Sequence, residues 1–136
     1  TVSFATTTGA ALVAQGKGGR IVNVSSIAGL TGLPNIAPYN ATKAAMDSLT
    51  RSMAVELGPA GACCTPIAPG TIATEIPDAL LTANPALKER FISKTPLARV
   101  GVTDEAAWPI VFLLTDAAAF LTGQTIVVDG GRLAAG

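Results

Sequence analysis

The fold is decided by residues 20–70, which run RIVNVSSIAGLTGLPNIAPYNATKAAMDSLTRSMAVELGPAGACCTPIAPG. The β-branched run at 20–24 and the apolar run at 62–68 each predict a buried strand. Pro38 suits a first helical turn and Gly58-Pro59 stops a helix, so we expect a helix from about Pro38 to Leu57. Strand, helix and strand in this order are typical of a parallel α/β unit. The apolar positions of the helix recur at steps of three and four: Ala45, Leu49, Met53, Ala54 and Leu57.

The flanking residues extend the same alternation. We expect a helix over 1–15 that ends at Gly16 and Gly18-Gly19, short helices near 78–82 and 85–93, a helix capped by Thr103, and a strand over 124–128. This order predicts a doubly wound, Rossmann-like parallel sheet in one α/β domain over residues 1–136. Because three apolar strands need neighbours on both edges, we expect the domain to be incomplete, with further strands before Thr1.

Charge and apolar pattern exclude several classes of function. Nine Lys and Arg balance nine Asp and Glu, and no basic stripe is present, so nucleic acid is not expected as a partner. The longest apolar stretch, residues 106–121, is broken by Pro109, Thr115 and Asp116, which argues against a membrane span. The sequence shows no secretory signal, so we expect a cytoplasmic protein with reduced cysteines.

The inventory of ligating side chains argues against metal and against nucleophilic triads. The chain has no histidine, which excludes Ser-His-Asp and Cys-His catalysis and most zinc sites. Its two cysteines, Cys63 and Cys64, are adjacent, and neighbours in a strand point to opposite faces. We interpret them as two small hydrophobic residues, and we expect no metal site.

The candidate chemistry lies on the long helix and at the end of the first strand. Tyr39 and Lys43 are four residues apart and therefore share a helix face. An ammonium near a phenol favours the phenolate, which suits a general acid/base at neutral pH. Ser26, at the end of a strand, can hydrogen-bond a substrate oxygen. Two other hydroxyls are open alternatives: Ser25 would point away from Ser26, and Thr42 is three positions from Tyr39, so we interpret both as structural.

A lone Tyr-x-x-x-Lys match is usually a solvated helix face, but here it occurs within a longer ordered pattern. The chain closely resembles the short-chain dehydrogenase/reductase family over essentially all 136 residues. The segments that carry the resemblance are Asn23–Ser26, Tyr39–Ala45, Pro69–Thr74, Thr122–Gln124 and Val128–Gly131. The resemblance implies an oxidoreductase that interconverts an alcohol and a carbonyl with NAD or NADP.

The resemblance also assigns roles to particular residues. It implies that Ser26 holds the substrate oxygen, that Tyr39 exchanges a proton with it, and that Lys43 favours the Tyr39 phenolate. Ser26 and Pro69-Gly70 both follow expected strands, and ligands bind at the carboxyl ends of strands in open α/β sheets. Lys43 would bind the nicotinamide ribose, and the segment after Pro69 would pack against the nicotinamide. The implied cofactor-binding set is Tyr39, Lys43, Pro69, Gly70, Ile72 and Thr74.

The sequence departs from the family pattern at three places. The family's glycine-rich phosphate turn follows a strand, whereas Gly16–Gly19 follows an expected helix, so we interpret it as a helix end. The family's active-site Asn would lie before Thr1. Pro66 stands where the family has a β-branched run, and we expect it to disturb the strand leading to Pro69. An alternative function is therefore a non-catalytic fragment or scaffold descendant of the fold, unable to bind cofactor alone.

Substrate and assembly are also expectations from the resemblance. The segment 75–96 would line the substrate pocket and mixes apolar with charged side chains, which indicates a small and modestly apolar substrate. The long helix is rich in small residues that permit close approach, so we expect a homodimer or homotetramer. Those residues are Ala41, Ala44, Ala45, Ser48 and Ser52.

Overall fold

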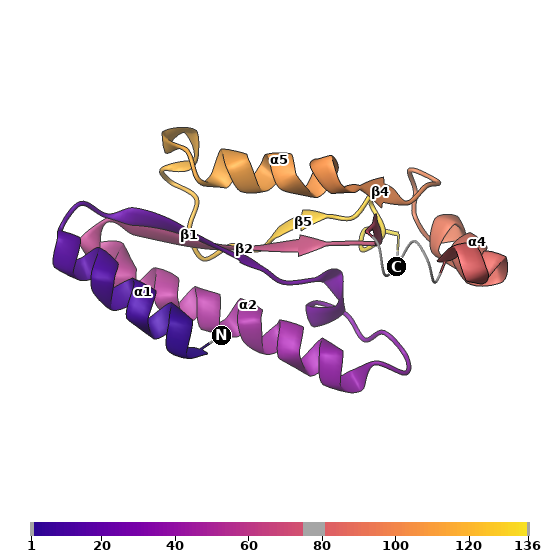
Figure 1. Cartoon of the computed structure of the whole chain (residues 1–136), viewed down its shortest axis with the longest axis horizontal. Coiled ribbons are helices and arrows are strands. Elements are labelled where there is room, and N and C mark those ends of the chain that lie inside the picture. Colours follow the sequence, from indigo (N-terminus) through magenta and orange to yellow (C-terminus); the bar gives the residue numbers. More distant parts are fainter. Residues whose placement is uncertain (1, 75–80, 136) are drawn as a thin grey trace.

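A computed structural model describes residues 2–74 and 81–135 of the chain. Helices and strands alternate along the chain and stack in three layers, with a parallel sheet in the middle (Figure 1). The elements are α1 (Val2–Gln15), β1 (Gly19–Val24), η1 (Ile27–Gly29), α2 (Ala37–Leu57), η2 (Gly58–Ala60), β2 (Ala62–Pro69), β3 (Ile72–Ala73), α4 (Pro85–Ser93), β4 (Gly101–Val102), α5 (Thr103–Leu113), η3 (Asp116–Ala118) and β5 (Ile126–Val128).

The main sheet has the order β1-β2-β5, and all of its pairings are parallel. Helices α1 and α2 cover one face of this sheet, and α5 covers the other face (Figure 1). The expected α/β class with a doubly wound parallel sheet is therefore confirmed. Among the described residues, no helix has the length and apolar character needed to cross a membrane.

The core lies between α2 and the central strand β2. Most of β2 is buried, and Cys64 packs against Met53 and Ala54 of α2 with no exposed surface of its own. The sequence correctly placed Met53 and Ala54 on the buried face of α2 but was wrong for Ala45, which is exposed. Ala45 is two residues before the buried Asp47, and two residues correspond to roughly 200° around a helix, so the two side chains point in nearly opposite directions.

Pro66 lies inside the central strand, contrary to the expectation that it would disturb this segment. Strand β2 continues through Pro66 to Pro69, and Pro66 pairs with Asn23 of β1. Toward β5 the pairing begins only at Ile67, so Pro66 precedes that ladder. Proline has no backbone N–H to donate to the sheet, but the side chain of Pro66 is fully buried in the core.

Three boundary expectations need correction. Thr103 does not cap α5: Val102 holds the N-cap position, and the Glu105 carboxylate accepts from its backbone N–H at 2.9 Å. The reason is β4, which keeps the backbone extended up to Val102. Strands β3 and β4 were not expected, because two-residue strands have too few positions to show a period. The last strand begins at Ile126 instead of 124. Most of the helix expected near 78–82 lies outside the described residues.

Candidate active site

The carboxyl ends of β1, β2 and β5 meet at one edge of the sheet because the three strands are parallel (Figure 1). The segments that follow the strands are fixed to each other by backbone hydrogen bonds. Ser25 N–H donates to the Ile67 carbonyl at 2.7 Å, and Gly70 N–H donates to the Val128 carbonyl at 2.9 Å. Ser26 and the segment that begins at Gly70 therefore start from the same edge, where open α/β sheets bind ligands.

Ser26 is half-buried and extended, with φ −166° and ψ 155°. Its Oγ caps η1 by accepting from the Ala28 N–H at 3.2 Å. The hydroxyl hydrogen has no acceptor within the described part of the chain, so it remains available to donate. A half-buried hydroxyl with a free hydrogen can bind the oxygen of a carbonyl.

Tyr39 and Lys43 lie together on the first turns of α2. The Lys43 ammonium is 5.6 Å from the centroid of the Tyr39 ring and donates to the Val24 carbonyl at 2.9 Å. The Tyr39 side chain is 48% exposed, which leaves it accessible to a reactant. Lys43 thus links the helix that carries Tyr39 to the last residue of β1, two residues before Ser26.

A buried carboxylate, missed in the sequence, fixes α2 against the strand ends. Asp47 is 1% exposed; its Oδ2 accepts from Ser25 Oγ at 2.7 Å and its Oδ1 accepts from Thr125 Oγ1 at 3.1 Å. Its spacing was the available signal, because Tyr39, Lys43 and Asp47 follow one another at steps of four on one helix face. The network joins the end of β1 and the approach to β5 to the same helix.

The two alternative hydroxyls make structural contacts. Ser25 is 3% exposed and its Oγ lies within hydrogen-bonding distance of Asp47 and, at 3.1 Å, of the Lys43 carbonyl. Thr42 donates to the Pro38 carbonyl at 2.8 Å within its own helix. Gly29 allows this close packing, because a Cβ there would come within 2.7 Å of the Lys43 backbone.

The candidate cofactor segment, residues 69–74, runs from β2 through β3. A Cβ at Gly70 would lie 2.8 Å from the Asp129 backbone, so this position requires the absence of a side chain. Ile72 pairs with Gly101, and Gly101 N–H donates to the Thr71 carbonyl at 3.0 Å. Thr71 and Ile72 line a small cavity of about 110 Å³, and Thr74 is exposed. The segment is thus fixed by its close approach to Asp129 and by its pairing with β4.

The residues present fit the nicotinamide end of a dinucleotide. An ammonium has three donors, and Lys43 has one described hydrogen bond, to Val24, so two N–H groups remain for ribose hydroxyls.

The glycines between α1 and β1 form a helix-to-strand turn: Gly16 and Gly18 have φ of 62° and 70°. A phosphate turn leads from a strand into a helix, so the interpretation of Gly16–Gly19 as a helix end is confirmed.

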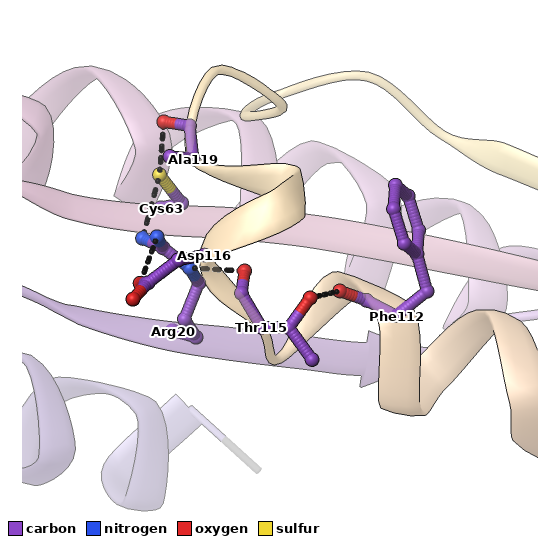
Figure 2. A network of polar contacts seen from close by, with 6 residues as sticks. All are labelled: Arg20, Cys63, Phe112, Thr115, Asp116 and Ala119. Carbon is purple, nitrogen blue, oxygen red and sulfur yellow. Dashed lines mark hydrogen bonds and ion pairs between the residues drawn. The ribbon is translucent and has the colours of Figure 1, made fainter.

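The cysteines lie away from this site. Burial raises the pKa of the Cys64 thiol to about 11, with a smaller contribution from Cys63. Cys63 is not the plain hydrophobic residue we expected: its Sγ accepts from Arg20 Nη1 at 3.3 Å and donates to the Ala119 carbonyl at 3.4 Å (Figure 2). Arg20 is the second residue of β1 and therefore lies at the opposite end of that strand from Ser26. Within residues 2–74 and 81–135, no group of three potential metal ligands forms.

Comparison with known proteins gives a consistent result. Residues 1–132 match the sequence model of the family described as enoyl-(acyl carrier protein) reductase. The L-rhamnose 1-dehydrogenase (NAD(P)(+)) of Azotobacter vinelandii is 46% identical over 117 residues, covering 86% of this chain and 45% of the relative. The 3-oxoacyl-(acyl-carrier-protein) reductase of Rickettsia conorii is 39% identical over 119 residues, covering 88% and 48%.

A solved structure supports the same relationship. The gluconate 5-dehydrogenase of Burkholderia cenocepacia, crystallised with NADP and tartrate, superposes with a TM-score of 0.85 at 35% identity. The match covers 90% of this chain and 48% of that chain. The chain spans about half the length of the curated relatives it matches. Its sequence, its parallel sheet and its match to the family model together place the chain in the short-chain dehydrogenase/reductase family of oxidoreductases.

Proposed function

We propose that the protein containing this chain interconverts an alcohol and a carbonyl with NAD or NADP. The observation that carries the proposal is the position of Lys43, which contacts both the Tyr39 ring and the last residue of β1. This places a phenol and a cation against the end of the strand that leads, two residues later, to the hydroxyl of Ser26.

In the reducing direction, each side chain has a separate task. The Ser26 hydroxyl donates a hydrogen bond to the carbonyl oxygen and holds it near Tyr39. The Tyr39 hydroxyl transfers its proton to that oxygen, and the nearby Lys43 ammonium stabilises the phenolate that remains. When bound, the nicotinamide supplies the hydride. Lys43 also offers its two remaining donors to the ribose, and the segment 69–74 forms the wall against the ring.

The relatives leave the substrate open. Their names refer to L-rhamnose, to 3-oxoacyl groups on acyl carrier protein and to gluconate. Family membership therefore supports a small substrate with a hydroxyl or carbonyl group, but it does not identify a particular compound. A homodimer or homotetramer is part of the same proposal.

The deciding experiment measures nicotinamide oxidation by the complete protein with a panel of ketones, aldehydes and keto acids. We expect turnover with NADH or NADPH that is unchanged by a metal chelator, because the proposed roles belong to side chains. Absence of turnover over the whole panel, together with absence of nucleotide binding by calorimetry, would favour the alternative of a non-catalytic descendant of the fold.

A further inference from the structure

A second groove lies where the loop that leads into α2 meets α4. It has a volume of about 430 Å³ and is bordered by the loop 31–36, by α4 and by the C-terminal residues Arg132 and Leu133. The loop and α4 lie toward the same end of the molecule (Figure 1). A volume of this size suits a small molecule.

The groove adjoins Tyr39 through the chain. The loop 31–36 leads directly into α2, in which Tyr39 is the third residue. Asn40, the next residue, donates to the Leu33 carbonyl at 2.8 Å and so fixes this wall of the groove to the first turn of α2. The groove wall formed by residues 31–36 is therefore fixed to the turn of α2 that carries Tyr39.

The charge of the groove is one-sided. Arg90 and Lys94 of α4 and Arg132 all line it, and within the described part of the chain no acidic side chain does. The ion pairs of the described residues, Arg20 with Asp116 and Arg99 with Glu105, leave these three cations without a carboxylate partner. Three unpaired cations around one cavity create a strongly positive local potential.

Arg132 is the most informative of the three. Its Nη1 is buried and has no hydrogen-bond partner among the described residues. Its guanidinium lies 5.9 Å from the centroid of the Phe91 ring, which holds the planar group against one apolar wall. A buried guanidinium nitrogen without an acceptor is costly, and a bound anion would satisfy it.

We infer that the groove binds the anionic group of the substrate, a carboxylate or a phosphate. Arg132 is the central ligand, Arg90 and Lys94 add charge at the rim, and apolar side chains such as Leu33 and Phe91 contact the carbon chain. The inference rests on the proposed function, because it places the reducible carbonyl at Tyr39. The composition of segment 75–96 indicated only a modestly apolar substrate, and the inference adds that the substrate carries a negative charge.

The test uses the complete protein and two matched pairs of ketones. Acetoacetate and its methyl ester differ in a carboxylate, and dihydroxyacetone phosphate and dihydroxyacetone differ in a phosphate. We expect at least one charged ketone to have a kcat/KM about tenfold or more above that of its neutral partner, because a hydrogen bond between Arg132 and a charged group stabilises the bound ketone by about that factor. The pair that shows the preference identifies the anion.

Variants assign the preference to the groove. Arg132→Gln should remove most of it by raising KM for the charged ketone while leaving the neutral ketone within about twofold. Arg132→Lys should restore part of it, because the charge returns without the planar fork. Lys17→Gln, which removes an exposed positive charge outside the groove, should change neither ketone. Thermal unfolding of each variant checks that it is folded.

Calorimetry separates this inference from the proposed function, because binding of the four compounds to the nucleotide-free protein needs no turnover. Tight binding of a charged compound that Arg132→Gln abolishes would support the groove even in a protein without activity. Equal binding or turnover of charged and neutral partners, or a charge preference that survives in Arg132→Gln, would overturn the inference while leaving carbonyl reduction intact.

Discussion

Tyr39 differs from an ordinary solvated tyrosine in what surrounds it: the Lys43 ammonium lies beside its ring and is anchored to the Val24 carbonyl. We expect Tyr39→Phe to lower kcat of the complete protein by at least about a hundredfold, since it removes the proposed general acid and leaves the ring. Single-turnover kinetics with a ketone and reduced cofactor measure the effect. Thr42→Ala, on the same helix, should stay near the parent rate. Near-normal turnover of Tyr39→Phe would remove Tyr39 from the mechanism.

Asp47 is a second residue whose substitution should have a measurable effect, in this case on stability. The hydroxyls of Ser25 and Thr125 both donate to its buried carboxylate, so truncation leaves the Thr125 hydroxyl without its acceptor and the Ser25 hydroxyl with only the Lys43 carbonyl. We expect Asp47→Ala to lower the free energy of unfolding by roughly 2–4 kcal/mol. Chemical denaturation of the complete protein measures it. Glu56→Gln, exposed on the same helix, should stay within about 0.5 kcal/mol of the parent protein. An equally small effect for Asp47→Ala would show that this network does not hold α2 to the strand ends.

At the scale of elements, the junction between β4 and α5 depends on one carboxylate. Arg99 donates to Glu105 through Nη2 at 2.5 Å and Nη1 at 2.7 Å, and Glu105 also accepts from the Val102 N–H that caps α5. The hydrogen bond from Arg99, followed by that from Val102, lowers the pKa of Glu105 from 4.5 to about 2. Because the pKa is lower in the folded protein, the stabilisation is complete above pH 4.5 and is lost as the pH falls from there toward 2.

The corresponding prediction is a titration. In an NMR titration, Glu105 of the parent should titrate well below 4.5, and Arg99→Gln should raise its pKa part of the way back. The Val102 N–H still favours the charged form, so the return should be incomplete. Arg51→Gln, on α2, should leave the titration of Glu105 unchanged. A pKa near 4.5 in the parent would contradict the bidentate contact.

At the scale of the whole molecule, α2 offers a surface for assembly. Its small residues Ala41, Ala44, Ala45, Ser48 and Ser52 are all exposed. We expect the complete protein to be a homodimer or homotetramer, and Ser48→Arg should shift it toward monomer because a bulky cation prevents close approach of helices. Light scattering at about micromolar concentration measures the mass. Ala83→Arg, exposed outside α2, is the control. A strictly monomeric parent would refute the proposal.

The length of the chain relative to its relatives leads to a last prediction. In the proposed site, Lys43 and the segment 69–74 would contact only the nicotinamide end of a dinucleotide. The turn at Gly16–Gly19 leads from a helix into a strand, which is the opposite order from a pyrophosphate-binding turn. Val24 on the edge strand β1 is 47% exposed. A polypeptide of these 136 residues alone should therefore bind NADH and NADPH poorly and unfold without a sharp transition. Calorimetry that gives a dissociation constant in the low micromolar range, or a cooperative melt of a soluble monomer, would contradict this.

The sequence by itself determined the order and type of the main elements and brought Tyr39 and Lys43 to one helix face. Both results depend on local periodicity: apolar runs for β1 and β2, and steps of three and four for α2. Both cysteines were expected to be small hydrophobic residues of a strand, which holds for the buried Cys64 but not for Cys63. Local patterns of this kind survive folding whenever the tertiary contacts agree with them.

Only the tertiary structure decided which distant groups meet. Asp47 with Thr125, Arg20 with Cys63 and Asp116, and Arg132 with Phe91 all join residues more than 25 positions apart, and no local pattern encodes such pairs. The two-residue strands β3 and β4 exist because they pair with each other. Pro66 is tolerated in β2 because the pairing with β5 begins after it. In each case the stabilising partner lies elsewhere in the chain, so packing rather than local propensity sets the outcome.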